Sequence, residues 1–193
     1  LRSDRIRSLV FGSDEFLWIT TEYGGLNSLD TRTLKMRFYQ GDGKLEIDNV
    51  MLSVAEDSHG RIWTGTPTGL YMFEKTSGRF TKFTEKEGLP NNFINAIIID
   101  DQGLVWVTTN NGVAKLDSDG KVLKLYDKGD GFQSNEFNNK SALKLSDGRI
   151  ALGGINGFNI FDPFGFSERK YKPELVFTEF RIFNKPVSPN DRD

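Results

Sequence analysis

The stretch IWTGTPTGLYMFE, residues 62–74, joins two strand-like runs through a glycine turn, and its pattern recurs elsewhere in the chain. Trp63 lies in the first apolar run, a glycine follows six residues later, and the second run ends in an acid. The same cadence appears in LWITTEYGGLNSLD (17–30), VWVTTNNGVAKLD (105–117) and IALGGINGFNIFD (150–162), the last without its tryptophan. Similarity at a fixed period predicts a repeat architecture.

The tryptophans set the period of the repeat. The spacing is 45 residues from Trp18 to Trp63 and 43 residues from Trp63 to Trp106. A further 45 residues lead to Ala151, at the matching place in the fourth copy. The first copy also departs from the pattern, because Glu15-Phe16 stands where the other copies have a glycine.

Each copy contains four strand candidates, and the third copy shows them best. They are FINAIIID (93–100), LVWVTT (104–109), VAKLD (113–117) and KVLKLYD (121–127). The Asn-Gly pair between the second and third strands favours a tight hairpin turn. The inner strands are apolar on both faces, whereas the fourth alternates, as expected of an outermost strand with one wet face.

A four-stranded sheet repeated every 40–45 residues is typical of a β-propeller blade. We therefore predict an all-β fold with four four-stranded antiparallel blades within residues 1–163, forming part of a larger ring. The predicted blades span residues 4–40, 48–84, 91–127 and 135–162. The tryptophan of each blade should fill the space between neighbouring blades.

The pattern breaks after residue 162. The polar, proline-containing segment 164–174 reads as a linker. The run LVFTEFRIFNKPV, residues 175–187, alternates as a strand followed by a turn, and we expect it to begin a β-sandwich that is cut short at residue 193.

Composition excludes several classes of protein. The 193 residues carry a net charge of -2, with 37% hydrophobic and 12% aromatic residues, which suits a soluble globular protein. No basic run favours nucleic acid, and no apolar stretch is long enough to embed the chain in a membrane. The absence of cysteine excludes disulfides and thiolate chemistry. Because the first residue is leucine, we expect a piece of a longer protein.

Few residues point to catalysis or to a metal. His59 is the only histidine and lies in a turn, where few partners can converge on it. Asp57, Asp101 and Asp147 recur near the first turn of their blades, so we interpret them as turn caps rather than as paired catalytic acids. The segment DSDGK, residues 117–121, begins like a calcium loop but lacks the closing glutamate. We therefore predict no catalytic residue, no metal and no cofactor.

Two sets of loops should emerge on one face of the propeller, near the axis. They are the hairpin loops between the second and third strands of each blade and the connections between blades. Their polar side chains could hydrogen-bond a small-molecule or oligosaccharide ligand, with Tyr23 as a stacking surface. The alternative is that the asparagines serve only as turn residues. The candidate ligand-binding residues are Tyr23, Thr66, Asn92, Asn110, Asn111, Asn135 and Asn156.

Three successive segments resemble one family, the two-component regulator propeller. GLPNNFINAIIIDDQGLVWVTTNNGVAKLD (88–117) resembles its repeat. DGFQSNEFNNKSALKLSDGRIALGGINGFNIFDP (130–163) resembles the terminal repeat, in which the tryptophan is typically lost. PELVFTEFRIFNKPV (173–187) resembles the opening of the triple-tyrosine domain that follows these propellers.

This resemblance implies the periplasmic ectodomain of an inner-membrane sensor whose output is a histidine kinase, often hybrid, or a diguanylate cyclase. Many such sensors respond to glycan fragments. The chain itself is then a non-enzymatic ligand-sensing segment, tethered to a membrane protein without being embedded. Because a partial ring exposes apolar blade faces, we also expect that the chain pairs with itself as a homodimer.

Two other readings stay open. Propeller enzymes, such as streptogramin lyases and sialidase-like glycosidases, use similar blades, but they require a histidine near the axis or a cluster of arginines and acids. A protein-interaction scaffold would bind another chain instead of a small molecule.

Overall fold

The computed structural model describes residues 3–39, 47–165, 181–182 and 185–186. These residues form an all-β structure whose only helices are two single 3₁₀ turns, η1 (Glu85–Glu87) and η2 (Lys128–Asp130). In this described part, no helix has the length and apolar character needed to cross a membrane.

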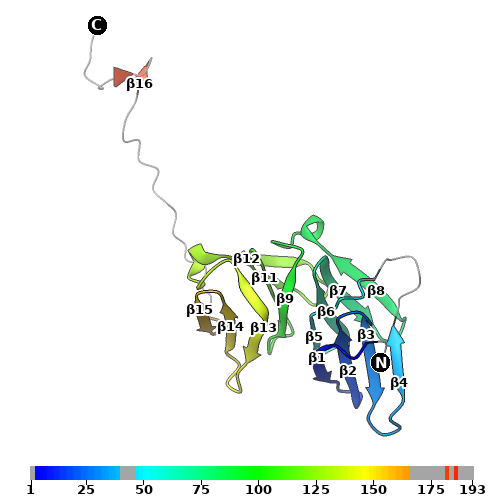
Figure 1. Ribbon diagram of the computed structural model, residues 1–193. Coiled ribbons are helices and arrows are strands. Elements are labelled where there is room, and N and C mark those ends of the chain that lie inside the picture. The colour runs from blue at the N-terminus through cyan, green and yellow to red at the C-terminus, as the bar shows by residue number, and fades with distance from the viewer. Residues whose placement is uncertain (1–2, 40–46, 166–180, 183–184, 187–193) are drawn as a thin grey trace.

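The strands form successive antiparallel sheets, each built from neighbours in sequence (Figure 1). The first sheet contains β1 (Ile6–Phe11), β2 (Phe16–Thr21), β3 (Leu26–Asp30) and β4 (Met36–Tyr39). The second contains β5 (Ser53–Glu56), β6 (Ile62–Thr66), β7 (Gly69–Glu74) and β8 (Arg79–Phe83). The third contains β9 (Ile94–Ile99), β10 (Val105–Thr109), β11 (Gly112–Leu116) and β12 (Val122–Tyr126). The fourth contains β13 (Phe137–Lys144), β14 (Ile150–Gly154) and β15 (Gly157–Phe161).

The predicted all-β propeller architecture is confirmed. The first three sheets are four-stranded blades, and the fourth sheet has three strands within the described residues. Beyond the blades, β16 (Arg181–Ile182) pairs with β17 (Lys185–Pro186). Of the predicted linker, only residues 164 and 165 are described. Apart from β16 and β17, the predicted sandwich strand lies outside the described residues.

Each tryptophan packs against the blade that follows it, as expected from its size. Trp18 lies 5.9 Å from Phe73 of the second blade, measured between ring centroids, and Trp106 lies 5.2 Å from Phe161 of the fourth. Trp63 packs among Val105 and other buried residues of the third blade. These three interfaces are the hydrophobic cores of the molecule.

The outer faces of the first and fourth blades remain uncovered by described residues. Ala151, which replaces the tryptophan, is flanked in register by Leu143 and Ile160, and those two side chains are 59% and 46% exposed. At the other end of the series, Leu9 and Phe11 of β1 are also exposed. The blades therefore end in apolar surfaces on both sides.

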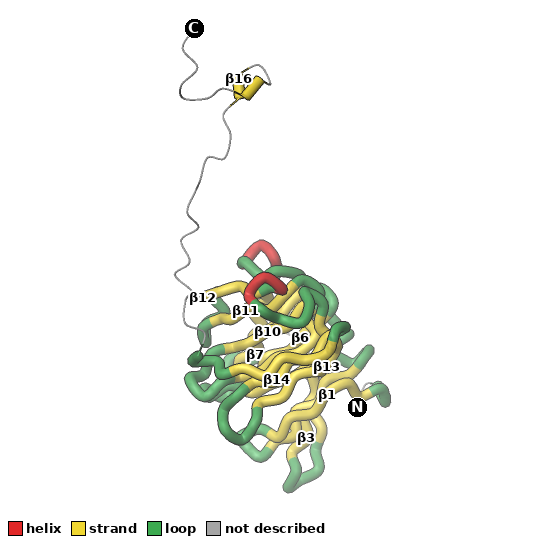
Figure 2. The backbone as a smooth tube through the Cα atoms, turned by 90° about the vertical axis from the view of Figure 1, so that its left-hand side faces the viewer, coloured by secondary structure: helices red, strands yellow, loops and turns green. Residues whose placement is uncertain are grey.

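The blade connections carry the two short helices, which lie on the same side of the molecule (Figure 2). Each helix begins with a capping box, formed by Thr84 and Glu87 in η1 and by Asp127 and Asp130 in η2. Each is followed by a glycine with a φ of 100°, a left-handed conformation that glycine adopts without a Cβ clash.

Candidate functional site

The hairpin loops and the blade connections meet on one face, which we call the loop face. Asn111 Nδ2 of the β10–β11 hairpin donates to Pro90 O of the preceding connection at 3.2 Å. Asn156 N of the β14–β15 hairpin donates to Gln133 Oε1 of its own connection at 2.8 Å. The two sets of loops therefore emerge together, as the blade topology predicts.

Several predicted site residues hold these loops in place. Asn92 Oδ1 accepts from Glu85 N at 2.9 Å, and Asn135 Oδ1 accepts from Lys128 N at 2.8 Å, so both carboxamides fix the start of a 3₁₀ turn. Thr66 is buried, with its hydroxyl 2.7 Å from Asp48 Oδ2. These side chains already have protein partners.

The remaining candidates are spread over the loop face. Asn110 lines a cleft of about 340 Å³, whereas Asn111 and Asn135 line a separate hollow of about 260 Å³ beside Asp127 and Asp130. The exposed ring of Tyr23 makes a cation–π contact with the guanidinium of Arg5, which lies 5.7 Å from the ring centroid. The structure thus joins Asn111 with Asn135 and does not gather the seven candidates into one pocket.

The cleft at Asn110 contains residues that sequence reasoning missed. Asn95 is buried and donates through Nδ2 to Asn110 Oδ1 at 2.9 Å. Phe93, Glu136, Phe137, Asn138, Asn139 and Ile155 complete the lining. The doublet Asn138-Asn139 could have indicated this site from the sequence. Asparagine is depleted in β-strands, so two in succession favour an irregularity in the strand.

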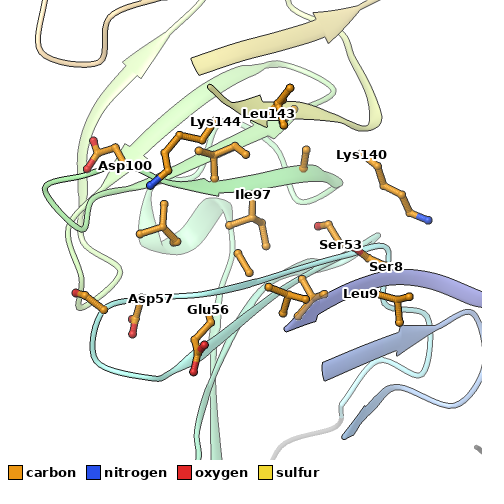
Figure 3. Close-up of a pocket in the computed structure, with 18 of the residues that line it drawn as sticks. Ser8, Leu9, Ser53, Glu56, Asp57, Ile97, Asp100, Lys140, Leu143 and Lys144 are labelled. Atoms are coloured by element: carbon orange, nitrogen blue, oxygen red, sulfur yellow. The ribbon is translucent and has the colours of Figure 1, made fainter. Parts of the chain in front are cut away.

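A larger hollow of about 760 Å³ lies between the inner strands β1, β5, β9 and β13 (Figure 3). We call it the axial hollow. None of the seven predicted site residues lines it. The inner strands read as ordinary core strands in the sequence, and only their arrangement around one space makes the hollow.

The acidic side chains along the axial hollow have partners. Asp57 pairs with Arg61 Nε at 2.8 Å and accepts from Trp63 Nε1 at 2.9 Å. Burial raises the pKa of Asp57, but the hydrogen bonds from Trp63 and Arg61 outweigh it and hold the pKa below its usual value. Asp101 pairs with Lys144 at 2.8 Å.

A lysine joins two of the blades beside this hollow. Lys75 Nζ lies 2.5 Å from Glu56 Oε1 and 2.7 Å from Asp14 Oδ2. Burial lowers the pKa of Lys75, but the hydrogen bonds to both carboxylates outweigh it and raise the pKa. The contacts with Asp14 link the second blade to the first.

The turn-cap interpretation of the recurring aspartates needs one correction. Asp57 and Asp147 accept from backbone N–H groups within their own turns, as predicted. In the third blade, however, the capping residue is Asp100, whose Oδ1 accepts from Gln102 N and Leu104 N at 2.9 Å. Asp101, one residue later, points its carboxylate at Lys144 instead.

His59 and the DSDGK segment behave as turn residues. His59 N donates to Asp57 Oδ1 at 2.9 Å. Asp117 Oδ1 accepts from Asp119 N at 3.0 Å and from Lys121 N at 2.9 Å, and these hydrogen bonds close the turn.

Comparison with known proteins agrees with this architecture. Residues 45–68 and 88–111 match the family model of the two component regulator propeller. Histidine kinase P4 of Formosa agariphila is 30% identical over 97% of this chain, and the match covers 14% of that protein.

Solved structures show the same fold. The extracellular domains of the hybrid two component systems BT3049 and BT4673 from B. thetaiotaomicron superpose with TM-scores of 0.73 and 0.72, at 28% and 27% identity. These matches cover 84% and 86% of this chain but only 22% and 24% of those chains. Virginiamycin B lyase from Staphylococcus aureus, at 15% identity and a TM-score of 0.61, shares the fold alone.

The repeats, the blades and the relatives agree with one another. Two segments of this chain therefore match the two component regulator propeller model, and the chain shares its fold with the extracellular domains of hybrid two-component systems.

Proposed function

We propose that this chain is a ligand-sensing segment of the extracytoplasmic propeller of a two-component sensor, and that it is not itself an enzyme. The observation that carries the proposal is the match to the BT3049 extracellular domain over 84% of this chain at 28% identity. In the whole protein, we propose, the propeller lies in the periplasm and is tethered to a membrane-bound histidine kinase. We propose that this kinase is of the hybrid type, which also carries a response-regulator domain. The name of the Formosa relative supports a kinase output.

The ligand in this proposal is a glycan or another small polar molecule bound on the loop face. The cleft at Asn110 supports it, because carboxamides both donate and accept hydrogen bonds, as sugar hydroxyls require. Phe93 adds an apolar surface against which a sugar ring can lie. Tyr23, exposed on the same face, is a second stacking surface.

Signalling requires that the ligand bind one state of the receptor more tightly than another. A cleft between neighbouring blades meets this requirement, because Asn110 lies in a hairpin loop of the third blade and Asn139 lies in β13 of the fourth. Ligand contacts with both would favour one relative placement of the third and fourth blades.

The exposed apolar faces at Ala151 and at Leu9 support a further part of the proposal, that the isolated chain associates as a homodimer. Analytical ultracentrifugation tests it, and a monomeric mass at high concentration would contradict it.

Calorimetric titration of the chain with a panel of oligosaccharides tests the ligand proposal. We expect at least one binder whose affinity falls when Asn110 and Asn139 are both replaced by alanine, because both side chains line the cleft. Asn49→Ala is the matched control, since Asn49 is exposed in another blade connection. Cleavage of an oligosaccharide would favour the enzyme alternative, and capture of a protein without any sugar would favour the scaffold.

A further inference from the structure

Strand β13 departs from the regular geometry of the inner strands. Its pairing with β14 shifts register between Phe137 and Ala142, so the intervening residues leave the ladder. Within this bulge Lys140 has a φ of 59°, a left-handed conformation that is costly for a residue with a Cβ. Bulges that re-aim a side chain, and backbone strain of this kind, are concentrated at functional sites.

The bulge lies between two of the hollows already described. Asn138 and Asn139 line the 340 Å³ cleft on the loop face. The next residue, Lys140, lines the axial hollow. Three consecutive residues therefore offer two carboxamides to one hollow and a cation to the other.

Lys140 differs in its pairing from the other charged residues of the axial hollow. Glu56 pairs with Lys75, Asp57 with Arg61, and Asp101 with Lys144. Lys140 has no ion-pair or hydrogen-bond partner for its ammonium group among the described residues, and it lies near Ser8 and Ser53, away from Asp57 and Asp100 (Figure 3).

The surroundings of Lys140 disfavour an isolated positive charge. Lys140 is exposed, but desolvation by the atoms around it lowers its pKa, and the nearby guanidinium of Arg7 lowers it further. Arg7 itself is paired with Glu22 at 2.8 Å. An anion beside Lys140 would relieve both effects.

We propose that the β13 bulge presents Lys140 to the axial hollow as the anchor for an anionic group of the ligand, a carboxylate or a sulfate. The proposal rests on the proposed function, because it names the chemical class of the ligand that the propeller senses. The bulge sets the direction in which the Lys140 side chain leaves the strand, as bulges do when they re-aim a side chain.

The test compares D-glucuronate with D-glucose, which differ in the carboxylate at C6, by NMR titration of this chain. We expect glucuronate to shift the amide signals of residues 138–142 and to bind about tenfold more tightly than glucose, because a charge-assisted hydrogen bond is stronger than a neutral one. Inorganic sulfate should compete at the same signals if charge, rather than the sugar ring, is recognised.

Three variants separate charge from folding. Lys140→Asn should abolish the preference for glucuronate, since asparagine tolerates the left-handed conformation but carries no charge. Lys140→Arg should keep the preference. Lys121→Asn is the control, because Lys121 is exposed at the turn before β12 and lines neither hollow.

Equal binding of the two sugars at these residues would overturn the anion proposal and leave sugar sensing intact. A preference for glucuronate that survives in Lys140→Asn would also overturn it. If neither glucuronate nor sulfate perturbs residues 138–142, the anion proposal fails, whereas the proposed function is judged separately by the oligosaccharide panel.

Discussion

The first and third blades build the same turn before their tryptophans with different residues. In the third blade, Asp100 Oδ2 accepts from Trp106 Nε1 at 2.8 Å, and Gly103 closes the turn with a φ of 80°. In the first blade, Gly12 stands in the place of the aspartate and Glu15 takes the positive φ, at 65°. Trp18 Nε1 is consequently buried, and it has no hydrogen-bond partner among the residues that the structure describes.

The first blade compensates through its neighbour. Asp14, two residues after Gly12, accepts from Lys75 of the second blade, and that ammonium group also lies 5.0 Å from the ring centroid of Trp18. A Cβ on Gly12 would lie 2.6 Å from Asp14 Oδ1, so an aspartate does not fit there while Asp14 keeps its position. The comparison teaches that one tryptophan site is stabilised within its own turn and the other by contacts between blades.

The largest expected effect comes from removing the carboxylate of the third blade. Asp100→Ala leaves Trp106 Nε1 and two backbone N–H groups without their acceptor and should lower the free energy of unfolding by about 2–3 kcal/mol. Urea denaturation measures it. Asp101→Ala is the matched control, and its exposed pair with Lys144 should contribute about 0.5 kcal/mol or less. Equal losses in both variants would contradict the role given to Asp100.

A smaller effect sharpens the comparison between the tryptophans. Trp106→Phe and Trp18→Phe make the same change of ring, but only the first removes the side-chain donor to Oδ2 of a buried carboxylate, that of Asp100. We expect Trp106→Phe to cost about 1 kcal/mol more than Trp18→Phe in the free energy of unfolding. Denaturation of both variants under the same conditions gives the difference, and a larger loss at Trp18 would break the comparison.

The smallest expected effect is a gain. Glu15→Gly should stabilise the chain by about 0.5–1 kcal/mol, because glycine adopts a positive φ without the Cβ clash. This figure already allows for the greater conformational entropy of glycine in the unfolded state, which opposes the gain. Its exposed pair with Arg32 contributes little. In the third blade the reverse change, Gly103→Ala, should cost about 1 kcal/mol. Thermal denaturation compares the two variants. A destabilised Glu15→Gly variant would show that the positive φ of Glu15 does not strain the first blade.

The loop face illustrates how far the sequence predicts the candidate site. The sequence placed Asn110, Asn111 and Asn156 in hairpin loops, because turn residues mark where strands end. It did not predict that Asn95 joins Asn110, since Asn95 lies inside an apolar strand. Nor did it predict that Asn92 and Asn135 cap 3₁₀ turns, because the same residue type serves both roles.

The sequence by itself determined the blades. Hydrophobic periodicity, tryptophan spacing and turn chemistry are local properties, and each blade is a local unit whose strands pair with their neighbours in sequence. Only the tertiary structure decided the axial hollow, the Lys75 link between blades and the position of Lys140. These features depend on how successive sheets are placed around a common space, and side chains that are 43 or 61 residues apart meet only through that placement.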